Sequence, residues 1–76
     1  MDVVDLLHAA GFTFQKWESS ELVRSWRDYS GKRVTGAWHE LDHQWKYLAS
    51  FGEELSPVFA DIGSLLTWMR VEGWIA

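Results

Sequence analysis

The sequence predicts an α+β fold with an N-terminal helix, a four-stranded antiparallel meander, and a C-terminal helix packed on one face of the sheet. Apolar residues recur at helical spacing near both ends of the chain, where capping residues and glycines mark the helix limits. Between them, turn-forming clusters recur at residues 18–21, 28–31, 40–43 and 50–53, and the intervening segments are rich in strand-favouring residues. No repeat or low-complexity run divides the chain, so a single domain is expected over residues 1–76.

The first helix is predicted from its caps and its apolar stripe. Asp2 can cap the N-terminus, Asp5 places a second carboxylate in the first turn, and Gly11 can end the helix in the left-handed conformation. The stripe consists of Val3, Leu6, Leu7 and Ala10.

The register of the meander follows from its turns. If residues 29–31 form a three-residue loop with Gly31 in the left-handed conformation, Trp26 faces Val34. A tight turn at residues 41–42 continues the same apolar face on the next strand, where the ring of Tyr47 can lie over Gly36. The expected pairs are Asp28 with Lys32, Trp26 with Val34, Leu22 with Trp38, Trp38 with Trp45, Gly36 with Tyr47, and Val34 with Ala49.

The second helix is predicted to begin at Ser56 and Pro57, as N-cap and first helical residue. Gly73 is expected to end it, with Trp74 and Ile75 folding back. The apolar residues at helical spacing are Phe59, Ile62, Leu65, Leu66 and Met69.

A small all-helical bundle is the alternative fold, because one helical face would also collect apolar residues of the middle segment. These residues are Trp38, Leu41, Trp45 and Leu48. Strands are favoured because residues 30–36, Ser-Gly-Lys-Arg-Val-Thr-Gly, suit a hairpin much better than a helix.

Composition restricts the classes of function. The chain has no cysteine, so it forms no disulfide or thiolate metal site, and stability has to come from packing of its six Trp, four Phe and two Tyr. The net charge of -4 argues against general binding to duplex nucleic acid. No apolar run approaches the roughly 20 residues that span a bilayer. We expect a cytoplasmic protein without a membrane segment or a cofactor.

Residues 39–43, His-Glu-Leu-Asp-His, match the HExxH pattern, in which two histidines bind zinc from one helical face. Three features argue against a zinc protease: the charged Asp42 inside the motif, no third ligand at a motif spacing, and little room for a substrate cleft. If the segment is a strand, a turn and a strand, His39 points away from the Trp38 face and His43 flanks the turn. No phosphate-binding loop or nucleophile elbow occurs elsewhere, so we expect neither catalysis nor a bound metal.

Two kinds of surface are candidates for binding a partner. The sheet face opposite the apolar one is expected to be positively charged, and arginine on such a face recognises phosphate or carboxylate. The expected contact residues are Arg27, Arg33, His39 and Lys46 on that face, with Trp17, Trp68 and Trp74 as partly exposed anchors. The alternative is an acidic surface that imitates nucleic-acid phosphates, formed by Asp2, Asp5, Glu53 and Glu54.

In size, acidity, lack of cysteine and aromatic density, the chain is similar in kind to small phage or mobile-element proteins that bind and block a host machine, including inhibitors of CRISPR complexes. This similarity implies a non-enzymatic interaction module that binds a larger protein or ribonucleoprotein, as a monomer or a homodimer. A nucleic-acid-binding module that uses the basic and aromatic sheet face is the alternative.

Overall fold

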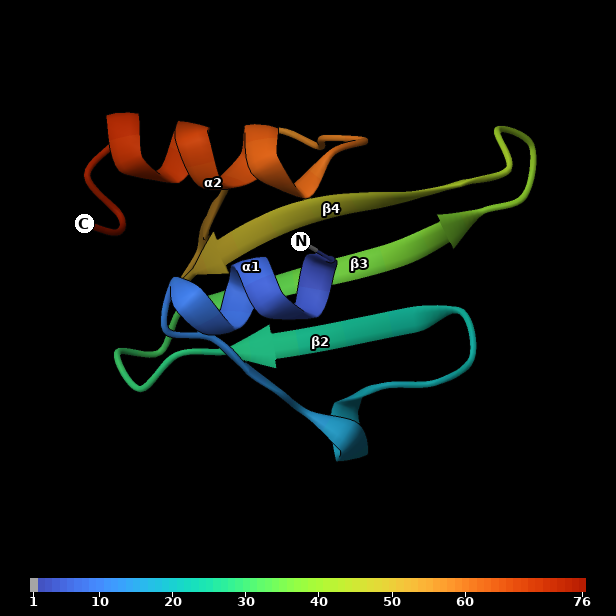
Figure 1. Cartoon of the computed structure of the whole chain (residues 1–76), viewed down its shortest axis with the longest axis horizontal. Coiled ribbons are helices and arrows are strands. Elements are labelled where there is room, and N and C mark those ends of the chain that lie inside the picture. Colours follow the sequence, from blue (N-terminus) through green and yellow to red (C-terminus); the bar gives the residue numbers. More distant parts are fainter. Residues whose placement is uncertain (1) are drawn as a thin grey trace.

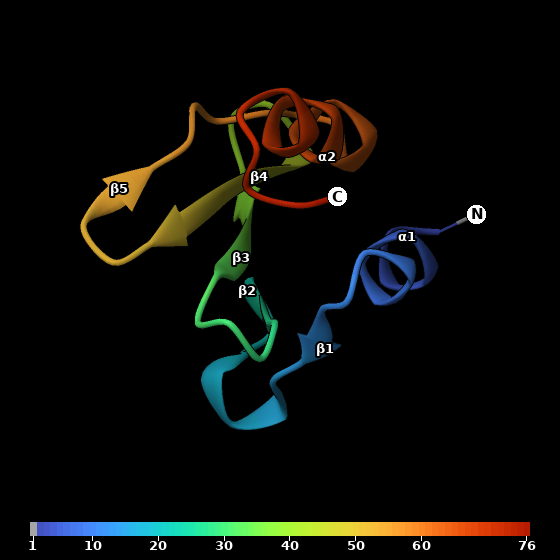
Figure 2. The same ribbon diagram turned by 90° about the vertical axis from the view of Figure 1, so that its left-hand side faces the viewer.

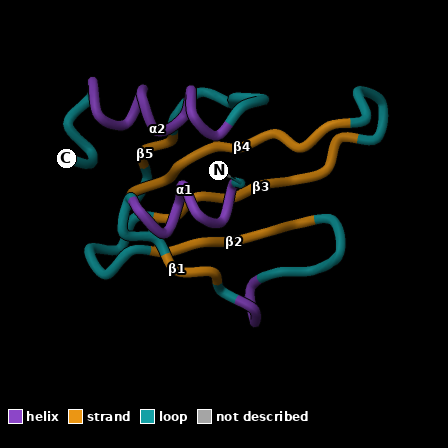
Figure 3. Tube along the Cα trace, in the orientation of Figure 1, coloured by secondary structure: helices purple, strands orange, loops and turns teal. Residues whose placement is uncertain are grey.

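The computed structural model describes residues 2–76 (Figure 1). Its elements are α1 (Val3–Ala9), β1 (Thr13–Phe14), the 3₁₀ turn η1 (Lys16–Glu18), β2 (Val23–Arg27), β3 (Arg33–His39), β4 (Gln44–Phe51), β5 (Glu54–Leu55) and α2 (Ile62–Val71). The strands form one antiparallel sheet in the order β1-β2-β3-β4-β5 (Figure 3). The α+β prediction is therefore confirmed and the all-helical alternative is wrong. Within residues 2–76, no helix is long and apolar enough to cross a membrane.

The hairpin of β2 and β3 has the predicted register. Trp26 pairs with Val34, and the backbone N–H of Asp28 donates to the carbonyl of Lys32 at 3.1 Å. Gly31 ends the three-residue loop at a φ of 98°, in the left-handed region that favours glycine. The turn chemistry and the apolar alternation therefore select the same register.

The hairpin of β3 and β4 also has the predicted register. Trp38 pairs with Trp45, Gly36 with Tyr47, and Val34 with Ala49. His43 takes a positive φ of 49° at the end of the loop, where it returns the chain to β4. The segment 38–45 is thus a strand, a turn and a strand, as predicted.

The strand count differs from the prediction, because the sheet has five strands and not four. The turn expected at residues 50–53 is shorter, since β4 continues through Phe51, which pairs with Glu54. Gly52, at a φ of 62°, allows the two-residue turn, and the chain returns along β4 as β5.

The predicted start of the second helix is wrong. Ser56 lies in an extended segment along β4, where its Oγ accepts a hydrogen bond from the N–H of Ala49 at 2.8 Å. Phe59 and Tyr47 exchange two backbone hydrogen bonds of 2.7 and 2.8 Å in the same segment. The N-cap is Asp61, whose Oδ2 accepts from the N–H of Ser64 at 2.9 Å. Pairing with the edge of β4 therefore outweighs the local capping signal.

The other helix limits are as predicted. The Oδ1 of Asp2 accepts from the N–H of Asp5 at 2.9 Å and caps α1, and Gly11 follows the helix at a φ of 94°. At the end of α2, Gly73 has a φ of 77°, and the N–H of Trp74 donates to the carbonyl of Met69 at 2.8 Å.

Both helices cover the same face of the sheet. Figure 2 shows α1 and α2 on one side of the strands, with β5 curling away from them. The buried core between the helices and this face consists of Leu7, Phe12, Trp26, Val34, Tyr47, Ala49, Ile62, Leu65, Leu66 and Met69. Neither helix covers the opposite face, which we call the open face.

Gly36 is central to this core because the ring of Tyr47 lies directly over it. A Cβ atom at Gly36 would lie 2.8 and 2.9 Å from two carbon atoms of that ring, and 3.6 Å from Trp26. The ring can cross β3 only where the strand has no side chain.

We predict that Gly36→Ala destabilises the fold by about 1–3 kcal/mol, because the added methyl group displaces the Tyr47 ring. Urea unfolding followed by circular dichroism measures this change. In a Tyr47→Val background, which removes the ring, the same substitution should cost much less. An equal cost in both backgrounds would show that the ring contact is not the cause.

Candidate functional site

The strand register places the predicted basic residues together on the open face. Arg27 lies opposite Arg33 across β2 and β3, and Ala37 lies opposite Lys46 across β3 and β4. His39 is exposed at the end of β3. The predicted grouping of these four side chains on one face follows from the observed register.

Arg27 is paired with Glu18, which belongs to the turn-forming cluster of residues 18–21. Its Nη2 lies 2.7 Å from Oε2 of Glu18, and its Nε donates to both carboxylate oxygens at 2.8 and 2.9 Å. These hydrogen bonds from Arg27, together with one from Ser25, lower the pKa of Glu18 to about 2. The same contact raises the pKa of Arg27. Glu18 reaches the open face because η1 turns the chain beside β2.

The other cations of the open face are also held within the chain. Lys46 forms an ion pair with Asp42, with Nζ and Oδ2 2.6 Å apart. Arg33 donates from Nε to the buried hydroxyl of Ser25 at 3.0 Å, and among residues 2–76 it forms no ion pair. The open face is therefore less positive than the sequence suggested, with Arg33 as its main uncompensated charge.

The HExxH segment does not have the geometry of a zincin helix. His39 ends β3 and His43 lies in the following loop, so they are not stacked on one helical face. The glutamate of the motif, Glu40, accepts a hydrogen bond from Nε1 of Trp38 at 2.7 Å. Within residues 2–76, no three acidic or histidine side chains cluster in a way that could hold a metal ion.

The predicted anchors and acidic residues do not form one surface. Trp17, on η1, is 96% exposed. Asp2 and Asp5 belong to the start of α1, whereas Glu53 and Glu54 belong to the β4–β5 hairpin, and Figure 2 shows α1 and β5 on opposite sides of the molecule. The acidic residues are thus two separate groups.

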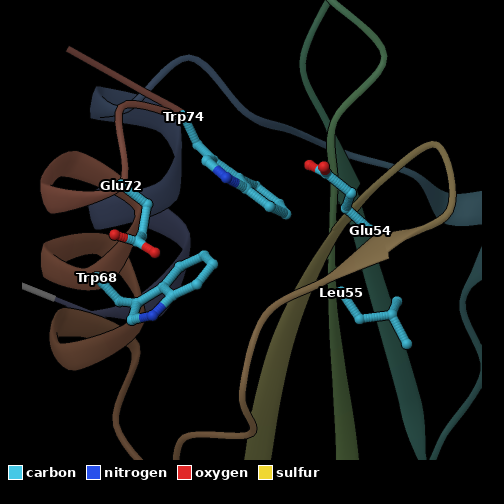
Figure 4. Close-up of a pocket in the computed structure, with 5 residues that line it drawn as sticks. All are labelled: Glu54, Leu55, Trp68, Glu72 and Trp74. Carbon is cyan, nitrogen blue, oxygen red and sulfur yellow. The ribbon is translucent and has the colours of Figure 1, made fainter.

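Trp68 and Trp74 come together in a pocket of about 520 Å³ (Figure 4). Their ring centroids are 5.1 Å apart at an interplanar angle of 71°, an edge-to-face contact. The reversal at Gly73 brings Trp74 back beside the last turns of α2. The ring of Phe51 packs against Trp74, with the two ring centroids 6.4 Å apart. We call this site the tryptophan pocket, and its lining residues are Glu54, Leu55, Trp68, Glu72 and Trp74.

Two carboxylates in the tryptophan pocket have no cationic partner within the described residues 2–76. Figure 4 shows Glu72 on the same side as the two indoles, and Glu54 on the facing hairpin of β4 and β5. Within residues 2–76, neither forms an ion pair, and both are exposed. An aromatic wall beside two free carboxylates is suited to a cation.

The sequence analysis named Trp68, Trp74 and Glu54 but missed Glu72 and Leu55 as pocket residues. Glu72 follows Trp68 by four residues, and this spacing places both on one face of a helix. That signal was available in the sequence. Leu55 had no such signal, because its position depends on the fifth strand.

We predict that Glu18→Gln makes the free energy of unfolding fall less steeply as the pH is lowered below 4.5. The lowered pKa of Glu18 favours its ionised form in the folded state, so its stabilisation is complete above pH 4.5 and is lost as the pH falls toward about 2. Thermal unfolding between pH 2 and 7 measures the effect. Some acid dependence should remain, because the hydrogen bond from Lys46 also lowers the pKa of Asp42.

Glu53→Gln is the matched control, since it removes the same charge from an exposed turn outside this network. A Glu18→Gln profile that coincides with the wild-type profile would contradict the role of the Glu18–Arg27 pair.

In comparisons with known proteins, no family model, curated protein or solved structure matches the chain. The open face and the tryptophan pocket differ in whether their charged side chains form ion pairs. On the open face Arg27 and Lys46 form ion pairs, whereas the two carboxylates beside the indoles of the tryptophan pocket form none in the part of the chain that the structure describes. The tryptophan pocket is therefore the candidate functional site.

Proposed function

We propose that the chain is a non-enzymatic protein-interaction module, and that its larger partner inserts a basic side chain into the tryptophan pocket. One observation carries this proposal: two indoles in edge-to-face contact share a pocket of about 520 Å³ with the carboxylates of Glu54 and Glu72. Aromatic residues concentrated in a pocket are the usual anchors of protein interfaces.

The chemistry of the pocket favours arginine as the inserted side chain. A guanidinium group stacks on an indole face and pairs with a carboxylate through two parallel hydrogen bonds. Lysine can satisfy the charge but not the planar geometry. The chain itself contains a similar contact beside the pocket, where Nζ of Lys32 lies 4.9 Å from the ring centroid of Phe51.

The finer prediction is that this binding blocks a host protein or ribonucleoprotein, such as a CRISPR effector. Its support is the chain's small size, its net charge of -4 and its aromatic content. Proteins that bind nucleic acid expose arginine and lysine along the nucleic-acid path. A pocket that accepts such a side chain would compete with the nucleic acid for that path.

Nucleic-acid binding by the open face is the competing proposal. Arg33 and the exposed His39 favour it, because both are available to a phosphate. The ion pairs of Arg27 and Lys46 weigh against it, since phosphate would have to displace Glu18 and Asp42. Trp26 and Tyr47, which could have stacked on bases, are buried in the core.

We predict that N-acetyl-arginine amide shifts the indole N–H signals of Trp68 and Trp74 in an NMR titration of the ¹⁵N-labelled chain. The neutral analogue N-acetyl-citrulline amide should shift them much less, because it has no charge to pair with the carboxylates. Glu54→Lys and Glu72→Lys should each weaken the response to arginine by roughly tenfold, and added salt should weaken it further.

Glu53→Lys is the matched control, because Glu53 is the exposed neighbour of Glu54 and does not line the pocket. Equal responses to arginine and citrulline, or equal losses in Glu53→Lys and Glu54→Lys, would overturn the proposal. A single-stranded oligonucleotide that binds at low salt and shifts signals of Arg33 and His39 would instead support the competing proposal.

A further inference from the structure

Trp17 differs from the other five tryptophans in its exposure to solvent. Its side chain is 96% exposed on η1, whereas the others are buried or half-buried. The proposed function gives Trp17 no role. Tryptophan is strongly enriched among the residues that anchor protein interfaces, where it fills a pocket of the partner. An indole in this position is therefore suited to insertion into a pocket of another molecule.

The turn that carries Trp17 is fixed to β2 on the side of the residues that follow it. Glu18 binds the guanidinium of Arg27 through Nε and Nη2. The Oγ of Ser19 accepts a hydrogen bond from the N–H of Ser25 at 3.0 Å. The indole is therefore presented from an ordered backbone, which lowers the entropic cost of inserting it into a partner.

Lys16 places a positive charge beside the indole. It is exposed, and among residues 2–76 it forms no ion pair. The acid on the same turn, Glu18, is bound to Arg27 and does not pair with Lys16. The surface of η1 therefore combines an apolar ring with a cation that has no acidic partner in the described chain.

The tryptophan pocket is complementary to this surface in chemistry and in size. It offers two indoles for edge-to-face packing and two carboxylates that form no ion pair within residues 2–76. A cavity of about 150 Å³ is sufficient for a benzene ring. The tryptophan pocket, at about 520 Å³, has room for an indole and an ammonium group together.

The surface of η1 and the tryptophan pocket lie at opposite edges of the sheet. One edge strand is β1, with η1 beside β2, and the other edge strand is β5, which lines the pocket with the end of α2. Figures 2 and 3 show the turn that follows β1 across the sheet from β5 and α2. Five strands at a spacing of about 4.8 Å are roughly 19 Å across, so Trp17 does not reach the pocket of its own chain.

We propose that the chain self-associates head to tail, with Trp17 and Lys16 of one copy seated in the tryptophan pocket of the next. This inference rests on the proposed function, because it assigns a second occupant to the same pocket. The ammonium faces the two carboxylates, and the indole packs against the two indoles of the pocket. A basic partner and a second copy then compete for one pocket, so self-association regulates binding of the partner.

Such a contact is heterologous, because it joins two different surfaces. Each assembly therefore keeps an unfilled pocket at one end and an exposed Trp17 at the other, and further copies can add to it.

Sedimentation velocity of the full chain at concentrations from about 10 µM to 1 mM measures this association. The weight-average sedimentation coefficient of the wild type should rise with concentration. Trp17→Ala and Glu72→Lys should each lower the association constant by roughly tenfold or more, because each removes one side of the contact. Both positions are exposed, so neither change disturbs the core. Tyr29→Ala is the matched control, since Tyr29 is 102% exposed on another loop, and it should associate like the wild type.

A mixture of the two variants tests the head-to-tail geometry. Trp17→Ala keeps an intact pocket, and Glu72→Lys keeps an intact Trp17. An equimolar mixture should therefore form a dimer and no larger species, although each variant alone stays monomeric. A wild type that is monomeric at 1 mM, undiminished association of Trp17→Ala, or a mixture that stays monomeric would each overturn the proposal.

The arginine titration, repeated on the Trp17→Ala chain, separates this inference from the proposed function. If the wild type stays monomeric and N-acetyl-arginine amide still shifts the indole signals of Trp68 and Trp74, the self-association is wrong and the proposed function stands. If association requires Trp17 and Glu72 but arginine leaves those signals in place, the self-association stands and the recognition of arginine is wrong.

Discussion

The packing of the Tyr47 ring over Gly36 is the contact on which the rest of the structure depends. Because β3 is the central strand, a side chain at this position would separate Tyr47 from Trp26 and divide the core. The period of a strand is two residues, so fixing this pair also fixes Val34 and Ala49 on the same face. Both helices then have a continuous apolar surface to cover, and the other sheet face is left open.

The distribution of charge follows from this one-sided packing. Acidic side chains near the edges of the open face reach its cations, so Glu18 pairs with Arg27 and Asp42 pairs with Lys46. Other acids form no ion pair within residues 2–76, and two of them, Glu54 and Glu72, border the tryptophan pocket. The tryptophan pocket thus combines two indoles with carboxylates from α2 and from the β5 edge of the sheet.

Features encoded by neighbouring residues could be predicted from the sequence, and features that depend on distant segments could not. The hairpin registers follow from Gly31, from the short 40–43 turn and from strict alternation. Ser56 and Pro57 resemble a helix start, but the free edge of β4 binds that segment in an extended form. The Glu18–Arg27 pair requires η1 to turn beside β2, and Glu54 meets Trp74 only through the fifth strand, so neither contact has a signal in the local pattern.

The strand order β1-β2-β3-β4-β5 also has a kinetic consequence, since every strand pairs with its neighbour in the sequence. Each pairing closes only a short loop, and loop closure is the main entropic barrier to forming a sheet. The central hairpin of β3 and β4 can form first and serve as a template for the outer strands. The contact between α1 and α2 joins opposite ends of the chain, so it depends on a much longer loop than any strand pairing does.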